Sequence, residues 1–244
     1  MLRREAEACE KCLLADSRTR VVFGEGDPHS DLMFVGEAPG YHEDQQGRPF
    51  VGQAGKLLEQ LLATIGLTRE QVYIANVLKS RPPNNRDPKP EEIEACQPYL
   101  LRQIQLIAPR VICTLGNFAT KLLSGSQTGI TRVHGIPQRT RIAGRELYLY
   151  PIFHPAAALY TPAMMATLKQ DFLRIPEVLG LPLGDDEDAA ARAAERYEGD
   201  AREPLDDAVR PFQRSFDDAP GGERGAGPPP VPGTGRPAEQ LGLF

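Results

Sequence analysis

Three polar side chains each stand at the end of a short apolar run in this sequence. Glu37 follows the run 32–35, Asn76 ends 72–76, and His154 follows 148–153. Pro155 restricts His154 to an extended backbone, which would hold its imidazole at the end of a strand. If the three runs are parallel strands, their carboxyl ends meet at one edge of a sheet. A carboxylate, an amide and an imidazole at that edge could bind a partly polar molecule.

A Gly- and Pro-rich loop adds an aromatic ring to this set. Gly36-Glu37-Ala38-Pro39-Gly40 is followed by residues 47–55, which contain Phe50, and then by an amphipathic run at 56–62. This order predicts a strand, a loop and a helix start, whose backbone N–H groups suit an anionic ligand. The four side chains together suit an extruded nucleobase, with Gly36 in the substrate-binding loop. Each of these side chains could instead be structural. Phe50 could cover the hydrophobic core, Asn76 could cap a turn, and His154 could bond a loop carbonyl.

Alternating strands and helices must position these side chains. We expect strands at 32–35, 72–76, 111–115 and 148–153, and helices at 1–15, 55–65, 90–108, 117–123 and 162–178. Prolines exclude strands and helices from residues 80–88. Ala143-Gly144 indicates a hairpin within residues 142–149. The alternation predicts an α/β fold with a central, mostly parallel four-stranded sheet flanked by helices.

Composition divides the chain near residue 180. The 244 residues include 28 Lys and Arg against 33 Asp and Glu, and beyond residue 180 seven arginines face 14 acidic residues. That stretch is rich in Pro and Gly and poor in apolar residues, which predicts disorder. We expect a folded domain at 1–180 and an acidic, disordered tail at 181–244.

The near-neutral charge of residues 1–180 leaves a nucleic-acid partner open. Lys79, Arg81, Arg86 and Arg132 could hold phosphates, or could form an ordinary solvated surface. No apolar run is long enough to span a membrane, and the first residues lack the apolar core of a signal peptide. We therefore expect a cytoplasmic protein, and separately we expect a monomer.

The four cysteines suggest a metal site. Cys9 and Cys12 are separated by two residues, while Cys96 falls in an expected helix and Cys113 in an expected strand. Because the cytoplasm disfavours disulfides, four thiolates suit zinc or an iron–sulfur cluster. A zinc ribbon uses two Cys-x2-Cys turns, and this sequence has only one such pair, which favours a cluster. Alternatively, Cys96 and Cys113 are ordinary buried thiols.

Taken together, these motifs resemble the family 4 uracil-DNA glycosylases. The resemblance covers residues 5–180 and rests on 36–40 with Glu43-Asp44, on 47–52, on Asn76 with 79–86, and on His154-Pro155. It implies a catalytic role for Glu37, stacking of Phe50 on uracil, reading of the polar edge of uracil by Asn76, and contact of His154 with uracil O2. It also implies a 4Fe–4S cluster on Cys9, Cys12, Cys96 and Cys113, although relatives carry cysteine where Ser80 stands.

The resemblance also implies an activity. An enzyme of this kind flips deoxyuridine out of single- or double-stranded DNA and hydrolyses its N-glycosidic bond, which initiates base-excision repair. A related branch attacks the sugar with a histidine, but residues 80–88 contain none, so a covalent mechanism is not expected. The alternatives are a non-catalytic iron–sulfur module that binds nucleic acid and a zinc-dependent interaction protein.

The last five residues form a separate motif. Gln240-Leu241-Gly242-Leu243-Phe244 resembles the peptide by which bacterial replication and repair proteins bind the β sliding clamp. A peptide on a disordered tether would hold the enzyme near DNA. The alternative is a chance apolar cluster, because short motifs often match by chance.

Overall fold

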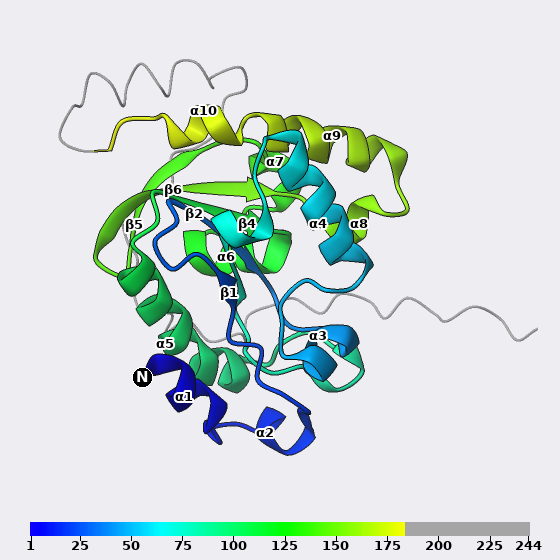
Figure 1. Ribbon diagram of the computed structural model, residues 1–244, viewed down its shortest axis with the longest axis vertical. Coiled ribbons are helices and arrows are strands. Elements are labelled where there is room, and N and C mark those ends of the chain that lie inside the picture. The colour runs from blue at the N-terminus through cyan, green and yellow to red at the C-terminus, as the bar shows by residue number, and fades with distance from the viewer. Residues whose placement is uncertain (184–244) are drawn as a thin grey trace, which may run out of the picture. The chain divides into compact units, whose positions relative to one another are not determined.

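The computed structural model describes residues 1–183, which form one sheet with helices on both faces (Figure 1). Within these residues the strand order is β1–β3–β2–β4–β6–β5. The strands are β1 (Glu25–Gly26), β2 (Leu32–Gly36), β3 (Tyr73–Asn76), β4 (Val111–Leu115), β5 (Gln138–Ile142) and β6 (Arg145–Ile152). The four central strands, β3, β2, β4 and β6, are parallel, which confirms the predicted core of the fold. Antiparallel β1 and β5 extend the sheet at its two edges.

Helices connect the strands and cover the sheet. The α-helices are α1 (Leu2–Glu7), α2 (Leu14–Ser17), α3 (Tyr41–Gln46), α4 (Gln53–Thr64), α5 (Pro90–Ile107), α6 (Asn117–Ser124), α7 (Ile130–Val133), α8 (Pro155–Ala158), α9 (Pro162–Leu173) and α10 (Ile175–Leu179). Two 3₁₀ turns, η1 (Arg69–Gln71) and η2 (Pro83–Asn85), lie in the connections.

Alternate side chains of each central strand enter different cores. Phe34 and Tyr150 pack with α4, α8, α9 and α10, whereas Met33 and Ile112 pack with α5 and α6 on the other face. Figure 1 shows the two groups of helices on opposite sides of the sheet. Because side chains alternate along a strand, the parity of a residue decides which core it enters.

Helix α5 starts as the sequence predicts. Pro90 is its first residue, and the Glu92 carboxylate accepts a hydrogen bond from the Lys89 backbone N–H at 2.9 Å, which caps the helix. The helix ends at Ile107, before Ala108 adopts a left-handed conformation. The predicted end at residue 108 is one residue too long.

Two predicted helices are divided in the structure. The predicted helix at 1–15 is replaced by α1 and α2, with Cys9 and Cys12 in the connection between them. The predicted helix at 162–178 separates into α9 and α10 at Arg174, because Pro176 lacks an N–H and excludes the carbonyl four residues earlier.

Helix α3 lies where the sequence predicts only a loop. It begins after Gly40, whose backbone N–H donates to the Glu43 carboxylate at 3.1 Å. That bond reproduces the reciprocal part of a capping box, so a short helix forms between two Gly-rich turns.

The folded body continues past the predicted boundary at residue 180. Leu181 is buried, and its carbonyl accepts a hydrogen bond from the Arg110 guanidinium at 3.0 Å. The Tyr148 hydroxyl donates to the Pro182 carbonyl at 3.0 Å. The rest of the predicted tail, including residues 240–244, lies outside the described residues. Among the helices that the structure describes, none is long and apolar enough to cross a membrane.

Candidate active site

The four side chains singled out in the sequence line one pocket. Glu37 follows β2, Asn76 ends β3 and His154 follows β6, so the parallel strands bring them to the same edge of the sheet. Phe50, from the loop between α3 and α4, joins them in a cavity of about 420 Å³. That volume lies within the range of small-molecule sites.

The pocket lies where the strand order reverses. The connection through α3 and α4 carries the chain from β2 to β3 on one side, and α5 returns it to β4 on the other side of β2. In open α/β sheets, ligands bind outside the carboxyl ends of the strands at such a switch point. The loop that begins at Gly36 is therefore in the expected position for a binding site.

Asn76 has an unpaired polar atom. The residue is 2% exposed, and among the described residues its Oδ1 has no hydrogen-bond partner. Leaving a buried acceptor unpaired costs about 1–3 kcal/mol, which a bound ligand could recover. A Cβ added at Gly36 would collide with Asn76 Oδ1 and with the Phe50 ring, so glycine keeps the space between them open.

The backbone of Phe50 has a conformation that side-chain-bearing residues rarely adopt. Its φ is +51°, in the left-handed region. A Cβ at Gly55 would collide with the Phe50 carbonyl, so the start of α4 can approach this turn only as glycine. The strain places the ring of Phe50 in the pocket, where it is 5% exposed.

Arg69, which the sequence did not single out, holds this turn. Its guanidinium donates to the Phe50 carbonyl at 2.7 Å and to the Pro49 carbonyl at 2.5 Å. The same side chain forms ion pairs with Glu25 and Glu59. These partners come from distant parts of the chain, and no local pattern connects them.

His154 is a neutral hydrogen-bond donor. Its Nδ1 accepts a hydrogen bond from the Ala156 backbone N–H at 3.1 Å, so this nitrogen carries a lone pair and the proton resides on Nε2. Burial lowers the pKa of His154 to about 4, against a smaller raising effect from Glu43. The ring therefore stays neutral at neutral pH and stacks against Phe50 with 5.6 Å between ring centroids.

Glu37 is a half-buried carboxyl group at the tip of β2. Burial raises its pKa, and the nearby negative charge of Asp87 raises it further. A raised pKa makes the carboxylate a better proton acceptor. The group therefore combines access to the pocket with the basicity that activation of a water molecule requires.

Glu43 shapes the pocket wall, a role that its motif alone did not predict. Its carboxylate accepts hydrogen bonds from the backbone N–H groups of Val51 and Gly52 at 2.8 and 3.0 Å, and also from Gly40. One side chain thus joins the two Gly-rich turns that carry Glu37 and Phe50. Its acidic type and position in the motif were visible in the sequence, but these contacts were not.

Comparison with known proteins places the chain in a family. The model of the uracil DNA glycosylase superfamily matches residues 23–175. The type-4 uracil-DNA glycosylase of Sulfurisphaera tokodaii is 48% identical over 186 residues, which cover 74% of this chain and 84% of that protein. The chain belongs to the type-4 uracil-DNA glycosylases. The type-4 enzyme of Archaeoglobus fulgidus is also 48% identical, over 72% of this chain and 91% of its own length. That of Thermotoga maritima is 49% identical, over 62% of this chain and 78% of its own length.

Two of the four basic residues that could hold phosphates instead contact other residues of the protein. Lys79 is buried, and its ammonium donates to the Asn76 carbonyl at 2.7 Å and to Gln103 Oε1 at 2.6 Å, so the prediction for Lys79 is wrong. Arg86 lines the pocket but forms an ion pair with Glu92.

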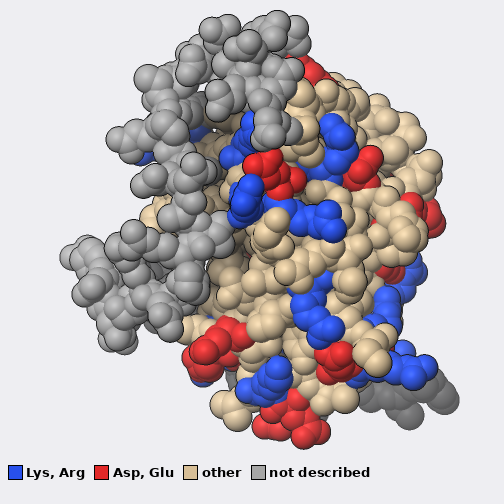
Figure 2. All heavy atoms as spheres, turned by 90° about the vertical axis from the view of Figure 1, so that its left-hand side faces the viewer, with Lys and Arg blue, Asp and Glu red and all other residues tan. Residues whose placement is uncertain are grey.

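The other two basic residues lie outside the pocket lining. Arg81 lies over the Tyr41 ring, with 5.3 Å between its guanidinium carbon and the ring centroid, and Arg132 is exposed on α7. On the side of α5 and β5, Figure 2 shows Lys and Arg interspersed with Asp and Glu where the surface is visible. That visible face therefore offers no continuous basic surface.

Three of the four cysteines come close to one another. Cys9 and Cys12 lie between α1 and α2, and Cys96 lies on α5. Burial raises the pKa of Cys96 to about 11, and the proximity of Cys12 and Cys9 adds to this shift. In residues 1–183, no group of three or more His, Cys, Asp or Glu side chains is close enough to bind a single metal ion. A four-iron cluster is larger than one ion and spreads its thiolates farther apart.

The expectation that Cys113 joins these thiols is wrong. Cys113 is fully buried in β4 and packs in the core with α9, where burial raises its pKa and the Asp171 charge raises it further. Cys96 packs in the core on the opposite face of the sheet. The sheet itself separates Cys113 from the other three cysteines.

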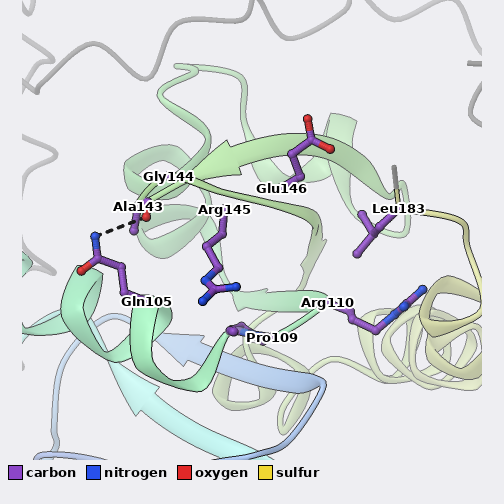
Figure 3. A pocket seen from close by; sticks show the side chains of 9 residues that line it. Gln105, Pro109, Arg110, Ala143, Gly144, Arg145, Glu146 and Leu183 are labelled. Carbon is purple, nitrogen blue, oxygen red and sulfur yellow. Dashed lines mark hydrogen bonds between the residues drawn. The ribbon is translucent and has the colours of Figure 1, made fainter. Parts of the chain in front are cut away.

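A second hollow lies at the other end of the sheet. Its volume is about 520 Å³, and it is lined by residues before β4 and around the β5–β6 hairpin, among them Gln105, Arg110 and Arg145 (Figure 3). Gln105 closes one side by donating to the Ala143 carbonyl at 3.3 Å. None of the side chains that the sequence singled out lines this hollow, so the carboxyl-edge pocket is the candidate active site.

Proposed function

We propose that this protein flips deoxyuridine out of DNA and hydrolyses its N-glycosidic bond, which initiates base-excision repair. The observation that carries the proposal is the unpaired Oδ1 of buried Asn76, in a pocket that also presents the Phe50 ring and the His154 imidazole. The type-4 relatives, with 48% identity, are named for the same activity.

Asn76 and Phe50 would recognise the base. Uracil presents an N3–H donor beside its O4 acceptor, so Asn76 Oδ1 can accept from N3–H while its amide donates to O4. Cytosine has the reverse arrangement and would leave both amide atoms mismatched. Stacking on the Phe50 ring adds about 1–3 kcal/mol without regard to the identity of the base.

His154 would stabilise the departing base. When the bond between C1′ and N1 breaks, its electron pair moves into uracil, and negative charge develops on O2. A neutral imidazole with its proton on Nε2 can donate a hydrogen bond to that oxygen without transferring the proton. Its fixed tautomer means that the ring need not reorganise during the reaction.

Glu37 would act on the sugar. As the sugar becomes an oxocarbenium-like cation, the carboxylate stabilises its positive charge and accepts a proton from the water that attacks C1′. The products are an abasic sugar with a new hydroxyl group and a uracil anion. The anion takes a proton from solvent, and Glu37 releases its proton to solvent. The half-buried position of Glu37 beside Asp87 supports this role because both raise its pKa.

We further infer that Cys9, Cys12 and Cys96 bind a 4Fe–4S cluster. The chemistry of the donors supports the assignment, since three thiols gather between α1, α2 and α5, and the Lys79 backbone N–H donates to Cys96 Sγ at 3.4 Å. Hydrogen bonds of this kind stabilise cluster sulfurs. The bound cluster would cross-link the N-terminal segment to α5, and no step of the hydrolysis described above uses it.

Substitution of His154 tests the proposed activity. We expect His154→Ala to slow single-turnover excision of uracil from a duplex by about 100- to 1000-fold, because one preorganised donor is lost. Alkali cleavage of the abasic product measures the rate. His29→Ala, at an exposed histidine beyond β1, is the matched control. Binding of uracil-containing DNA without release of free base by the wild type would instead identify a non-catalytic module.

We also propose that the enzyme acts as a cytoplasmic monomer and that residues 240–244 bind the β sliding clamp. The likeness of this peptide to clamp-binding sequences supports the second proposal, and so does the hydrophilic stretch before it. Attachment to a clamp that encircles DNA would raise the effective concentration of the enzyme at its substrate.

A further inference from the structure

An aromatic ring and a cation lie together at the rim of the pocket. Tyr41 is the first residue of α3 and is 55% exposed. The Arg81 guanidinium lies over its ring, with 5.3 Å between the guanidinium carbon and the ring centroid. Gly40, which precedes Tyr41, and Pro82, which follows Arg81, both line the pocket. The pair therefore borders the pocket from two different loops.

Both side chains of this pair are held by neighbours. Arg81 Nε donates to Asn85 Oδ1 at 2.7 Å, and Asn85 lines the pocket itself. The backbone between them turns through two successive left-handed residues, Asn84 and Asn85. The His42 ring contacts the Tyr41 ring nearly at right angles, with 5.5 Å between centroids. A ring ordered in this way loses little side-chain entropy when a ligand stacks on it.

The charge of Arg81 is not balanced by an acidic side chain. Within residues 1–183 its guanidinium forms no ion pair with a carboxylate, whereas Arg86 is paired with Glu92. A base can stack on an exposed aromatic ring, and a phosphate is attracted to a free cation beside it. The combination suits a nucleotide.

We propose that Tyr41 and Arg81 bind one of the two nucleotides next to the deoxyuridine, with its base stacked on Tyr41 and its phosphate beside Arg81. This inference rests on the proposed function, because it deepens the same substrate site. In a single strand the neighbouring base can leave its stack readily, whereas in a duplex it is held by pairing and stacking. Tyr41 therefore favours single-stranded substrates and helps to determine strand specificity.

The alternative is a purely structural role for the pair. The same contact also connects α3 to the segment before η2, so its loss could loosen the pocket rim. Loosening of the rim would affect duplex and single strand alike and would not depend on the neighbouring base. A substrate that lacks one neighbouring base separates the two explanations.

Excision assays with the full-length protein test the stacking. The probes are single-stranded oligonucleotides with one deoxyuridine, in which the nucleotide on its 5′ side, on its 3′ side or on neither side lacks a base. We expect Tyr41→Ala to lower kcat/KM for the intact single strand by about 5- to 100-fold, mainly through KM, because one stacked base is lost. The fall on a duplex should be no more than about twofold. The wild type should show a similar loss when the base is missing on one side, and Tyr41→Ala should then lose nothing further.

Substitution of Arg81 tests the phosphate contact. Arg81→Gln removes one cation, so the slope of log binding constant against log salt concentration for a single strand should become shallower by about 0.7. Fluorescence anisotropy measures binding to a single strand with one 2′-fluorinated deoxyuridine, which resists hydrolysis because fluorine disfavours a cationic sugar. Tyr41→Phe keeps the ring and should bind this strand as the wild type does.

Leu106→Ala is the matched control. It removes another exposed apolar side chain, on α5, and should change neither excision nor binding. Equal losses on duplex and single strand in Tyr41→Ala, or a wild type that is indifferent to missing neighbouring bases, would overturn this inference and leave the proposed function intact. A wild type that binds these strands but releases no uracil would refute the proposed function, while the binding data would still decide whether Tyr41 and Arg81 hold a nucleotide.

Discussion

At the scale of single residues, the pocket assigns one hydrogen-bonding role to each polar atom. The His154 tautomer is determined by a backbone N–H that can only donate, so Nε2–H is available to an anion. The Asn76 oxygen is buried without a partner among residues 1–183. An acceptor for N3–H and a donor for O2 therefore lie in the same pocket, and both suit uracil without a change of protonation.

Replacement of Asn76 by Asp tests the reading of the base. The carboxylate can no longer donate to O4 and repels the developing uracil anion, so we expect kcat/KM for uracil to fall by about 10- to 100-fold. A protonated or solvated carboxylate can accept from the N4 amine of cytosine, so preference for uracil should fall as well. Excision assays on duplexes with uracil or cytosine at one position measure both effects.

Asn85 provides the matched control. It lines the same pocket, but its Oδ1 already accepts from Arg81 Nε at 2.7 Å, so a carboxylate is tolerated there. We expect Asn85→Asp to keep the preference for uracil. An Asn76→Asp enzyme with unchanged discrimination would show that Asn76 does not read the base.

The sequence predicted the residues that end strands better than those that support them. Glu37, Asn76 and His154 each follow an apolar run, and the alternation of elements places such ends at one edge. Arg69 is buried and binds carbonyls about twenty positions earlier in the chain. Nothing in its local surroundings distinguishes it from a surface arginine on a turn.

At the scale of elements, the loop between α3 and α4 depends on this buried arginine. Arg69 is 7% exposed and binds two loop carbonyls as well as Glu25. The left-handed conformation of Phe50 is unfavourable by itself and persists because these contacts hold it. The position of the stacking ring thus depends on residues outside the pocket.

We expect Arg69→Met to destabilise the protein by about 3–5 kcal/mol, because it leaves Glu25 and two carbonyls without their buried partner. Urea unfolding measures the change in free energy, and kcat/KM for uracil should fall in the fraction that remains folded. Arg48→Met is the matched control, because Arg48 is 55% exposed and pairs with the same Glu25. Its loss should cost about 1 kcal/mol or less. Equal effects of the two substitutions would contradict the role given to Arg69.

The cysteines show where prediction at the scale of elements fails. The sequence correctly indicates that Cys113 lies in a strand, but not which face of the sheet it enters. That choice depends on the register with β2 and β6, which pairs Cys113 with Phe34 and Tyr150. Spacing alone therefore grouped four thiols that the sheet divides into three and one.

At the scale of the whole molecule, the sheet separates two functions. The pocket lies at the carboxyl edge of the central strands, while Cys9, Cys12 and Cys96 lie on the face covered by α5. The segment after β3 connects them, since Asn76 lines the pocket and Lys79 contacts Cys96 three residues later. A cluster on this face would therefore stabilise the backbone that positions the base-reading amide without entering the pocket.

The C-terminal peptide should act on the location of the enzyme and not on its chemistry. Deletion of residues 240–244 is expected to abolish binding to the β sliding clamp, as measured by surface plasmon resonance with immobilised clamp. Excision from a free oligonucleotide should be unchanged, because the pocket residues all lie between Glu37 and Ala156. Replacement of residues 234–237 by alanine is the control for general changes in this part of the chain. Clamp binding that survives the deletion, or is lost equally in the control, would refute this role. A matched fall in excision from free oligonucleotides would show instead that these residues contribute to the catalytic domain.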